Sequence, residues 1–595
     1  MALAVGALVV FGLIAMPAGA NAAKSTRDSA GVPASSPVTK YAIAVAVCPP
    51  PTAGHVQCLA MRKVYVPKGT PGAVPVKVGD GIATAHVATT GANATIGPAG
   101  GLTPSDLASA YGFNATGSGA KQTVGIIDWG NDPTIASDLN TFDAEYHLSA
   151  CTTTDGCFRI LNQLGKTSPL PTDQGGAGEI SLDVESVHAV CRLCKIDLIE
   201  VDDNSFYDTG AGVNEAVKLG ATEVSNSYGG PDTTGGALAY AADYNHPGVV
   251  IAASSGDHGY YGFDYWPDTP SGGPAATQQA PEFPAELATV VSVGGTSLYL
   301  NQNGTRHSET VWNEDGAKDQ SEELAGAPLG ASGGGCSQFV TAQAWQRNLT
   351  AWPKTACGTN RLDNDVSAVA DPYTGFDTYN RSDGGTGWET IGGTSLSSPV
   401  IAAMYALAGG ANGVTYPALT LYGHLGTPSL YNVTTLGNGF CGGEDAAECG
   451  NANDLEFDGV PLGVMDCDYP ASGSTPSVGD LACDAAPGYN GPSGVGTPKG
   501  LGSFAKAGPR ATISGPASVV HGVTHTWTAS TSDPFPRGAV KSYSWNWGDG
   551  SAATVTSTGS ASHHYATAGG HHTITLTVTD TYGQKGSATR TVAVS

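Results

Sequence analysis

The feature that most constrains the fold is an alternation, across residues 101–508, of short apolar runs with segments of helical periodicity. Residues 124–127 and 249–253 are continuous apolar runs, residues 196–201 and 223–228 are further strand-like segments, and residues 213–219 and 237–244 have helical spacing. Strands that are apolar on both faces and separated by helices are typical of a parallel sheet covered on both sides. The sequence therefore predicts an α/β domain with a doubly wound parallel sheet.

The last 85 or so residues have a different sequence pattern, typical of β-strands. Residues 573–579 (TITLTVT) alternate polar and apolar positions, as a half-buried antiparallel strand does. The stretch WNWGDG at 545–550 places a turn directly after an aromatic strand, and we interpret its Asp549 as a turn residue. We predict a small all-β, immunoglobulin-like sandwich over residues 511–595. The stretches WNWGDG and TITLTVTD resemble the PKD domain, a module that accompanies secreted hydrolases and implies contact with a polymer or a cell surface.

The N-terminal hundred residues divide into two parts. Residues 1–22 combine an apolar run with a small-residue exit, which is typical of a secretory signal peptide. Residues 23–100 are rich in Ala, Pro, Gly and Thr and show no clear helical period. The sequence leaves open whether this segment is a short propeptide or a β-rich extension that stays in the mature protein.

The cysteine content agrees with export. The chain has 12 cysteines, an even number, and close spacing suggests the pairs Cys48–Cys58, Cys151–Cys157 and Cys336–Cys357. Cys191 and Cys194 have the spacing of a redox or zinc motif, but without a second such motif a structural disulfide is the better interpretation. We expect a secreted, extracellular protein.

The net charge limits the classes of partner that the chain can bind. The chain has 26 basic and 52 acidic residues. Binding to nucleic acid depends on Lys and Arg neutralising phosphates, so we exclude nucleic acid as a partner. A length of 595 residues predicts two or three domains.

The candidate nucleophile lies in GGTSLSSP at 392–399, ahead of the apolar run VIAAMYALA. A helix that starts here would place Ser395 at its N-terminus, where backbone N–H groups favour an oxyanion. The competing interpretation is that Thr394 or Ser395 only caps the helix. A nucleophilic serine needs a base, and none of the 14 histidines has a recognisable catalytic neighbourhood. We interpret His188 as structural.

Two other motifs supply carboxyl groups. GEISLDVE at 178–185 has helical spacing, so Glu179 and Asp183 share a face one turn apart. Two acids that close repel, and their pKa values separate. ASSGDHG at 253–259 places Asp257 just after an apolar strand, where open α/β sheets bind ligands. Each motif alone has a plain structural explanation, as a solvated helix face or a turn.

Together, GEISLDVE, ASSGDHG and GGTSLSSP resemble the sedolisin family of serine-carboxyl peptidases, which have a subtilisin-like fold. Further similar stretches are LTPSDLASAYGF, EVSNSYGG, TVVSVGGTSL and GASGGGCS, so the resemblance covers about residues 101–508. It implies that Ser395 is the nucleophile, Glu179 its base, Asp183 the group that orients Glu179, and Asp257 the oxyanion donor. It also implies endopeptidase or tripeptidyl-peptidase activity at acid pH on protein or peptide substrates. The sequence does not separate these two modes of action, and we expect a monomer.

Acid pH is consistent with that set of groups. A histidine with a pKa near 6.5 is protonated at about pH 3–5, whereas a glutamate remains able to accept a proton. Asp257 can donate to an oxyanion only when it is protonated. We interpret Ser332, in the glycine-rich GASGGGCS, as part of a loop that approaches substrate with its backbone, and Glu185 and Asp197 as structural.

The family resemblance also implies a calcium site near the end of the catalytic domain. The candidate ligands here are Asn432, Val433, Ala486, Gly488 and Asn490. Asn stands at both positions where the family has Asp, and hard cations depend on such charges. The sequence therefore leaves open whether calcium binds at these residues.

Two other functions remain open from the sequence. One is a subtilisin-type serine peptidase with an unrecognised histidine; Asp128, in IIDWG, echoes the aspartate strand of those enzymes. The other is a catalytically inactive surface protein that binds a polymer or cell wall. Of these functions, the sequence favours the sedolisin-type peptidase.

Overall fold

The computed structural model describes residues 38–48, 54–70, 73–78, 97–172, 175–231, 235–260, 281–313, 330–382, 384–438, 456–457, 460–461 and 481–595. The segment 1–22, interpreted as a signal peptide, lies outside these residues. Cys441, Cys449 and Cys467 also lie outside them. Within the described ranges, no helix is both long and apolar enough to cross a bilayer.

The predicted parallel sheet is present. Eight strands run in the order β13-β12-β10-β8-β5-β7-β6, with β16 also paired to β12. All of these pairs are parallel except β12 with the edge strand β13. The strands are β5 (Thr123–Trp129), β6 (Phe158–Asn162), β7 (Lys195–Val201), β8 (Glu223–Asn226), β10 (Val250–Ser254), β12 (Val291–Leu300), β13 (Arg306–Val311) and β16 (Val366–Val369).

The strand order changes direction between β5 and β8, which makes the sheet doubly wound. From β5 the chain goes first to the edge strand β6 and returns to β7 beside β5, and it then proceeds outward through β8, β10 and β12 on the other side. Ligands of open α/β sheets bind beyond the carboxyl ends of the strands at such a switch point. The fold therefore predicts a binding site formed by the residues that follow β5, β8 and β10.

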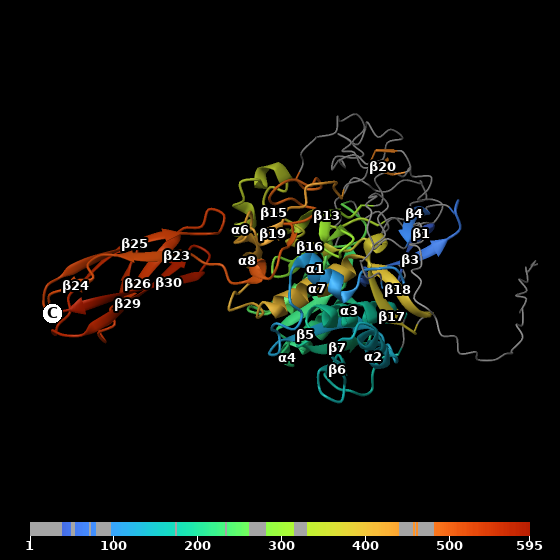
Figure 1. Cartoon of the computed structure of the whole chain (residues 1–595), viewed down its shortest axis with the longest axis horizontal. Coiled ribbons are helices and arrows are strands. Elements are labelled where there is room, and N and C mark those ends of the chain that lie inside the picture. Colours follow the sequence, from blue (N-terminus) through green and yellow to red (C-terminus); the bar gives the residue numbers. More distant parts are fainter. Residues whose placement is uncertain are drawn as a thin grey trace, which may run out of the picture. The chain divides into compact units, whose positions relative to one another are not determined.

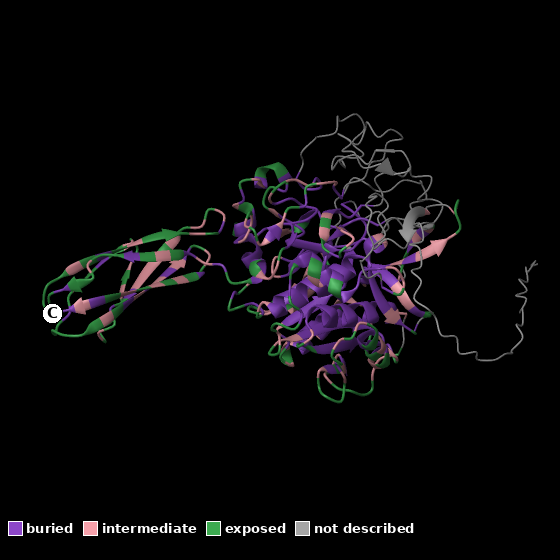
Figure 2. Cartoon of the chain, in the orientation of Figure 1, coloured by how far each residue is buried: buried purple, intermediate pink, exposed green. Residues whose placement is uncertain are grey.

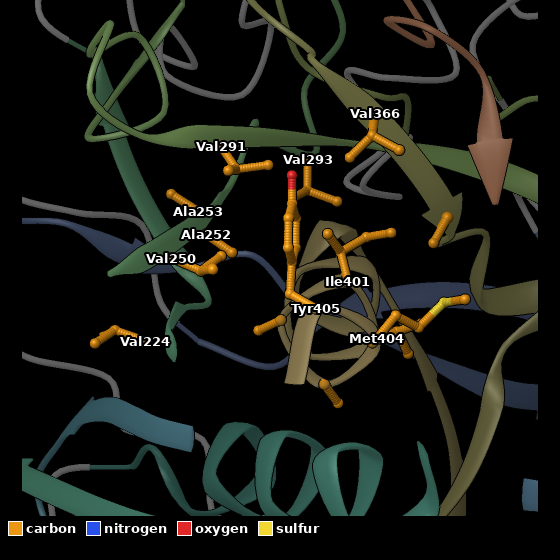
Figure 3. Close-up of a cluster of buried hydrophobic side chains, with 14 of the residues drawn as sticks. Val224, Val250, Ala252, Ala253, Val291, Val293, Val366, Ile401, Met404 and Tyr405 are labelled. Atoms are coloured by element: carbon orange, nitrogen blue, oxygen red, sulfur yellow. The ribbon is translucent and has the colours of Figure 1, made fainter. Parts of the chain in front are cut away.

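Two helices lie at the centre of the catalytic domain. All 14 residues of α3 (Ala177–Val190) and all 14 of α7 (Thr394–Leu407) are buried, and the two helices pack side by side (Figures 1 and 2). In Figure 3, α7 places Ile401, Met404 and Tyr405 among the valines and alanines of β8, β10, β12 and β16. Because small and β-branched strand residues form that surface, α7 can approach the sheet closely. The other α-helices are α1 (Pro104–Tyr111), α2 (Ile135–Glu145), α4 (Phe206–Lys218), α6 (Ala344–Arg347) and α8 (Ala418–Tyr422).

One helix differs in type from the expectation. Residues 237–244 form the 3₁₀ helix η1 (Ala237–Tyr244), not an α-helix. It ends shortly before Pro247, and residues that precede proline disfavour helical backbone angles. Shorter 3₁₀ helices are η4 (Trp352–Thr355), η5 (Pro372–Thr374) and η7 (Gly502–Phe504).

The N-terminal strands are built into the catalytic domain. A five-stranded sheet has the order β17-β18-β3-β1-β4, in which β1 (Val38–Ala46), β3 (Met61–Val66) and β4 (Val74–Val78) join β17 (Phe376–Asn380) and β18 (Gly387–Gly392). A second sheet joins β2 (Gln57–Cys58) to β9 (Tyr228–Pro231) and β11 (Glu282–Phe283). Remaining short strands are β14 (Cys336–Thr341), β15 (Asn360–Leu362), β19 (Leu430–Tyr431), β20 (Glu456–Phe457), β21 (Val460–Pro461) and β22 (Thr497–Pro498).

The expected short-range disulfides form. Cys48–Cys58, Cys151–Cys157 and Cys336–Cys357 are bonded, and so is Cys191–Cys194. The last pair excludes Cys191 and Cys194 as zinc ligands in this state, which agrees with the structural interpretation of that motif.

The C-terminal region is the expected β-sandwich. One sheet contains β23-β25-β28 and the other contains β24-β30-β29-β26-β27. The predicted alternating strand is β29 (His571–Asp580), whose buried positions alternate with less buried ones (Figure 2). Trp527, Trp545 and Trp547 form the centre of its core. The other strands are β23 (Arg510–Ser514), β24 (Ser518–Val519), β25 (His525–Ser532), β26 (Val540–Asn546), β27 (Thr554–Thr556), β28 (Ser560–His563) and β30 (Lys585–Val594).

Asp549 lies in the turn after β26, as expected. Its Oδ1 accepts hydrogen bonds from the backbone N–H and the hydroxyl of Ser551, at 3.0 and 2.6 Å. Such bonds to the residue two positions on are typical of turn aspartates.

Candidate active site

Ser395 lies in the first turn of α7, fully buried. Gly393 joins β18 to this helix with a φ of 91°, and a Cβ at this position would lie 2.1 Å from the Leu59 carbonyl oxygen. Only glycine meets both conditions without strain. The residue in the N-cap position is Gly393, with no side-chain cap, so neither Thr394 nor Ser395 caps the helix. The Ser395 hydroxyl instead donates to the Ser227 carbonyl at 3.0 Å.

The other two serines of the motif serve the packing of α7. The Ser397 hydroxyl donates to the Thr394 carbonyl of its own helix at 2.9 Å, and Ser398 shares a 3.1 Å hydrogen bond with Ser225 of β8. Both side chains are buried. Ser395 is therefore the serine of this motif that lies next to the carboxyl groups described below.

The predicted acid pair on α3 lies beside Ser395. Glu179 and Asp183 are both buried, one helical turn apart. Asp183 Oδ1 accepts a 2.7 Å hydrogen bond from the Ser227 hydroxyl. Both Glu179 carboxyl oxygens are buried and have no hydrogen-bond partner of good geometry. The Ser395 hydroxyl is nevertheless close enough to Glu179 to act against the rise of its pKa. Glu179 is thus close to Ser395 and free to accept a proton.

The third predicted acid approaches Ser395 from the sheet. Asp257 follows β10, and its Oδ1 accepts hydrogen bonds from the Thr394 backbone N–H at 2.7 Å and the Thr394 hydroxyl at 2.8 Å. Its Oδ2 is buried without a partner. That oxygen lies 2.6 Å from the point that a Cβ on Gly393 would occupy, next to the Leu59 carbonyl oxygen. Asp257 therefore presents one carboxyl oxygen to the space in front of Ser395.

A fourth carboxyl lies close to the pair. Asp128, near the end of β5, is buried, and both of its oxygens lack a hydrogen-bond partner. Its charge raises the pKa values of both Glu179 and Asp183. The sequence singled out Asp128 only as an echo of the subtilisin aspartate, and the structure places it near enough to the two acids of α3 to raise their pKa values.

Burial dominates the electrostatics of the site. It raises the pKa of Glu179 well above its ordinary value, and Asp183 and Asp128 raise it further. Burial and Asp128 do the same for Asp183, against the Ser227 hydrogen bond that lowers its pKa. Burial also raises the pKa of Asp128 to about 7. It raises the pKa of Asp257 to about 7 as well, although the Thr394 hydrogen bonds and His258 oppose that shift.

In the described part of the chain, no Lys or Arg side chain pairs with these acids. Within the described residues, none of the four carboxyls forms an ion pair with Lys or Arg. Four buried carboxyls without a counter-charge cannot all ionise at acid or neutral pH, so they share protons. The site can therefore hold both a protonated and an ionised carboxyl around one hydroxyl group.

Comparisons with known proteins agree with this arrangement. Residues 176–419 match the model of the subtilase family, and residues 506–595 match the PKD domain. The chain is 28% identical to sedolisin of Pseudomonas sp. strain 101 over 362 residues, which are 58% of this chain and 57% of that protein. It is also 28% identical to xanthomonalisin of Xanthomonas sp. strain T-22 over 377 residues, which are 57% of this chain and 42% of that protein.

The chain is therefore similar to sedolisin and xanthomonalisin, and its C-terminal region matches a PKD domain. A solved structure of Pseudomonas sedolisin, a serine-carboxyl proteinase complexed with two molecules of pseudo-iodotyrostatin, shares the fold with a TM-score of 0.51. That match has 24% identity and covers 68% of this chain and 96% of the other. The alignments with the two curated relatives span about half of their length.

No histidine in the described ranges is hydrogen-bonded to the Ser395 hydroxyl. The Ser395 hydroxyl donates to a carbonyl and to no imidazole in the part of the chain that is described. His188 is buried on α3, where its Nε2 lies 3.1 Å from Asp143 Oδ1 and 3.0 Å from the Ser149 carbonyl. It is a core histidine, as expected from the sequence.

The remaining candidate residues have structural partners. Ser332 receives a 2.9 Å hydrogen bond from the Gly295 N–H, and its glycine-rich loop packs on the backbone of Ser255 and Gly256. The close backbone contact found for this loop is with the segment that carries Asp257, and its predicted approach to substrate stays a prediction. Glu185 accepts from the Tyr379 N–H at 2.8 Å, and Asp197 pairs with Arg159.

The candidate calcium ligands lie together, but their hydrogen bonds do not fit a cation. Asn490 Nδ2 donates to the carbonyl oxygens of Ala486 at 2.9 Å and Val433 at 3.3 Å. Asn432 Oδ1 accepts from the Gly488 N–H at 2.9 Å. Calcium needs free oxygen ligands, and here an amide group already joins the two carbonyls. Among the described residues, no group of three or more His, Cys, Asp and Glu side chains is arranged to hold a metal.

Two contributors to the site were not singled out from the sequence. Ser227 bonds to both Ser395 and Asp183, and Leu59 carries the carbonyl that accepts the Ser395 backbone N–H at 2.8 Å. Ser227 stands within EVSNSYGG, inside the predicted strand-like segment 223–228 and directly after the observed β8, so its place at the switch point could have marked it. No local pattern distinguishes Leu59, because its position depends on strand pairing far along the chain.

Proposed function

We propose that the chain is a secreted, acid-active serine-carboxyl endopeptidase. In this proposal Ser395 is the nucleophile, Glu179 its general base, Asp183 the carboxyl that orients Glu179, and Asp257 the oxyanion donor. The observation that carries it is the convergence of three buried carboxyls on one helix-terminal serine, to which no histidine of the described ranges is hydrogen-bonded. Serine nucleophiles need an adjacent base, and Glu179 has free acceptor oxygens there.

The base step uses the shared proton of the acid pair. In the working state, Glu179 and Asp183 together carry one proton and one negative charge, because two adjacent carboxyls ionise in separate steps. The Ser227 hydroxyl donates a hydrogen bond to Asp183 Oδ1, which stabilises the ionised form of Asp183. Glu179 then takes the Ser395 proton as the hydroxyl attacks a peptide carbonyl carbon, and returns it to the leaving amine.

The oxyanion step uses two donors. The Ser395 backbone N–H points to the position of a carbonyl oxygen, which in this structure is the Leu59 oxygen at 2.8 Å. Asp257 Oδ2 faces the same space and can donate when it carries a proton. A pKa of about 7 keeps Asp257 protonated at acid pH, because burial disfavours its ionised form. Above that pH the same group would repel the oxyanion.

Location and partners follow from other features. Four disulfides in the described residues are typical of an oxidising compartment, which supports export. The substrates that we propose are proteins and peptides. The PKD domain supports contact with a polymer or a cell surface.

The test is digestion of a denatured protein from about pH 2 to pH 8, with products identified by mass spectrometry. Ser395→Ala and Glu179→Gln should each abolish cleavage. Matched controls are Ser397→Ala on the same helix and Glu185→Gln on the other, since neither side chain touches the site. Full activity of Glu179→Gln would favour a subtilisin-type mechanism, and inactivity of the unmodified chain at every pH would favour a binding protein.

A further inference from the structure

We propose that one end of the C-terminal β-sandwich binds a sulfated polysaccharide at acid pH through a group of histidine side chains. The inference deepens the polymer contact proposed for the PKD domain and rests on that proposal, but it does not depend on the peptidase mechanism. We name this surface the histidine end; it lies at the end of the sandwich where Figure 1 marks the C-terminus. Its members are His525, His563, His564, His571 and His572.

The sandwich differs in charge from the rest of the chain. Residues 511–595 contain 4 Lys and Arg side chains, 3 Asp, no Glu and 6 of the 14 histidines. That leaves 22 of the 26 basic and 49 of the 52 acidic residues in the rest of the chain. Histidine is the side chain whose charge ordinarily changes between about pH 5 and pH 8. Acidification therefore changes the sandwich from nearly neutral to clearly positive.

The strands of the sandwich bring the histidines together. His525, at the start of β25, lies directly opposite His563 at the end of β28. The ring centroids of His563 and His564 are 5.9 Å apart. The rings of His563 and His572 each lie 4.8 Å from the ring of Tyr565. The fifth histidine directly precedes His572 in β29, so residues from three strands form one group.

The aromatic core of the sandwich holds part of this group in fixed positions. His563 stacks on Trp547, with ring centroids 4.6 Å apart and an angle of 5° between the ring planes. The ring of His525 lies 6.3 Å from that of Trp527. Both tryptophans are fully buried, whereas His525, His563 and His572 are half-buried. These three imidazoles therefore close the end of the core and remain in contact with solvent.

Exposed hydroxyl side chains adjoin the group. Thr526 of β25 lies opposite Ser562 of β28, and their hydroxyls share a 2.7 Å hydrogen bond. The next pair along with the same orientation is Thr528 opposite Ser560, and all four side chains are exposed. His564, also exposed, directly follows β28. A polymer rich in hydroxyl groups can hydrogen-bond to such a surface while its anionic groups meet the imidazoles.

Asp549 is the acidic side chain that faces this group. Its Oδ2 lies 2.8 Å from His563 Nε2. Burial acts to raise the pKa of Asp549, but hydrogen bonds from Ser551 and His563 outweigh that effect and lower the pKa to about 2. The carboxylate therefore stays ionised at about pH 4–5 and offsets one imidazolium charge of the five that the histidine end can carry.

The other charged groups of the sandwich lie away from the histidine end. Arg590 donates to the carbonyls of Ile513 and Gly515. His521 Nδ1 lies 3.0 Å from the Ser595 backbone oxygen, so we do not count His521 in the group. The remaining charged side chains lie at the opposite end of the strands, where Val540 pairs with Asp580 and Thr579 with Lys585. They are Asp533, Arg537, Lys541, Asp580 and Lys585.

The charge pattern limits the chemistry of the partner. The partner must stay anionic at about pH 4–5, where the carboxyl groups of a protein, with pKa values near 3.9 and 4.3, are partly neutral. Sulfate esters derive from a strong acid and remain ionised there. Nucleic acid is bound mainly through Lys and Arg, and the described residues of the histidine end include neither. A polysaccharide with sulfate groups fits both the imidazoles and the adjoining hydroxyls.

The experiment measures binding of the full chain, as its Ser395→Ala variant so that no digestion occurs, to dextran sulfate at about pH 4.5 and about pH 7.5. We expect binding to be about tenfold tighter or more at the lower pH, and added salt should reduce this difference by screening the charges. Equal binding to neutral dextran at both pH values would keep the polymer contact and overturn the role of the histidines. Binding to neither polymer would overturn both. Duplex DNA bound as tightly as dextran sulfate would overturn the choice of a polysaccharide.

Two variants with opposite expected effects locate the site. His564→Gln with His571→Gln removes two exposed imidazoles and should weaken binding at about pH 4.5 by about tenfold, with little effect at about pH 7.5. Asp549→Asn removes a negative charge, keeps an acceptor for Ser551, and should strengthen binding, which a folding defect would not do.

The matched control is His147→Gln with His307→Gln, which removes two exposed imidazoles outside the sandwich and should leave the affinity unchanged. An equal loss in this control, or unchanged binding without His564 and His571, would overturn the assignment.

Discussion

The Ser227 hydroxyl donates a 2.7 Å hydrogen bond to Asp183 Oδ1, while the Ser227 carbonyl accepts the Ser395 hydroxyl at 3.0 Å. One residue of the chain after β8 thus bonds to both the proposed nucleophile and the acid behind the proposed base. The two bonds use different atoms of Ser227: its side chain binds the acid and also reaches the Ser395 carbonyl at 3.3 Å, whereas its backbone carbonyl accepts the Ser395 hydroxyl. A side-chain substitution therefore removes the bond to Asp183, together with the longer one to the Ser395 carbonyl, and leaves the acceptor of the Ser395 hydroxyl in place.

Ser227→Ala should move the acid limb of the pH–rate profile to higher pH. The hydroxyl lowers the pKa of Asp183, so without it the acid pair binds its second proton at a higher pH. A hydrogen bond to a charged group contributes about 1.5–3 kcal/mol, which corresponds to about one to two pH units. Steady-state kinetics across pH would measure the shift. Ser225→Ala, on the preceding strand, is the matched control, and an equal shift there would contradict the explanation.

Much of this site could be predicted from the sequence because its parts lie in strong local patterns. The spacing of Glu179 and Asp183 follows from helical periodicity alone, and Asp257 from its place after a buried strand. What the sequence could not give is the register between distant strands. Leu59 reaches Ser395 only because β2 pairs with β9 and β3 pairs with β18, across more than 150 residues in each case. Such pairings depend on the assembled sheets and leave no local signal.

Local sequence patterns also could not predict the 3₁₀ type of η1 or the hydrogen bonds at the implied calcium site. The 3₁₀ form of η1 depends on backbone hydrogen bonds that helical spacing cannot distinguish from those of an α-helix. The loss of two acidic residues from the implied calcium site was visible in the sequence. The amide bridge from Asn490 to Val433 and Ala486 was visible only in the structure.

Asp257→Asn should remove the alkaline limb of the activity profile. The Asp257 pKa of about 7, raised by burial, implies that the unmodified protein loses its oxyanion donor above that pH. An amide keeps a donor at every pH, and its oxygen can still accept from Thr394. Asp257→Ala has no donor and should lower kcat by about 10²–10³. An alkaline limb that stays near pH 7 in Asp257→Asn would assign it to another group.

Removal of calcium should not change the stability of the protein. The Asn490 amide joins the Val433 and Ala486 carbonyls directly, so no cation is needed between them. Calorimetry with and without a chelator should give the same melting temperature. Asn490→Asp should cost about 1–3 kcal/mol in chelator, because it loses both donors and buries a carboxylate, and added calcium should restore part of that loss. A lower melting temperature for the unmodified chain in chelator would show that calcium binds after all.

Asp128→Asn should flatten the fall in stability between about pH 4 and pH 7. Burial raises the pKa of Asp128 to about 7 in the folded protein, whereas an unfolded aspartate ionises near 3.9. The folded state thus holds a proton that the unfolded state has released. The free energy of unfolding therefore decreases as the pH rises through this range, by up to about 1.4 kcal/mol per pH unit for this group. An amide does not titrate, so the variant should lose that part of the slope.

The slope is best measured by denaturant unfolding in a Ser395→Ala background, which prevents self-digestion. Asp155→Asn is the control, since this exposed loop acid has a pKa lowered by the Cys157 N–H. A lowered pKa gives stability that is already complete above about pH 4, so the control should not alter the slope from pH 4 to pH 7. If Asp128→Asn and Asp155→Asn unfold with the same pH dependence as the parent, Asp128 is ionised in the folded protein. The proton shared among the buried acids would then have to reside on Glu179, Asp183 or Asp257.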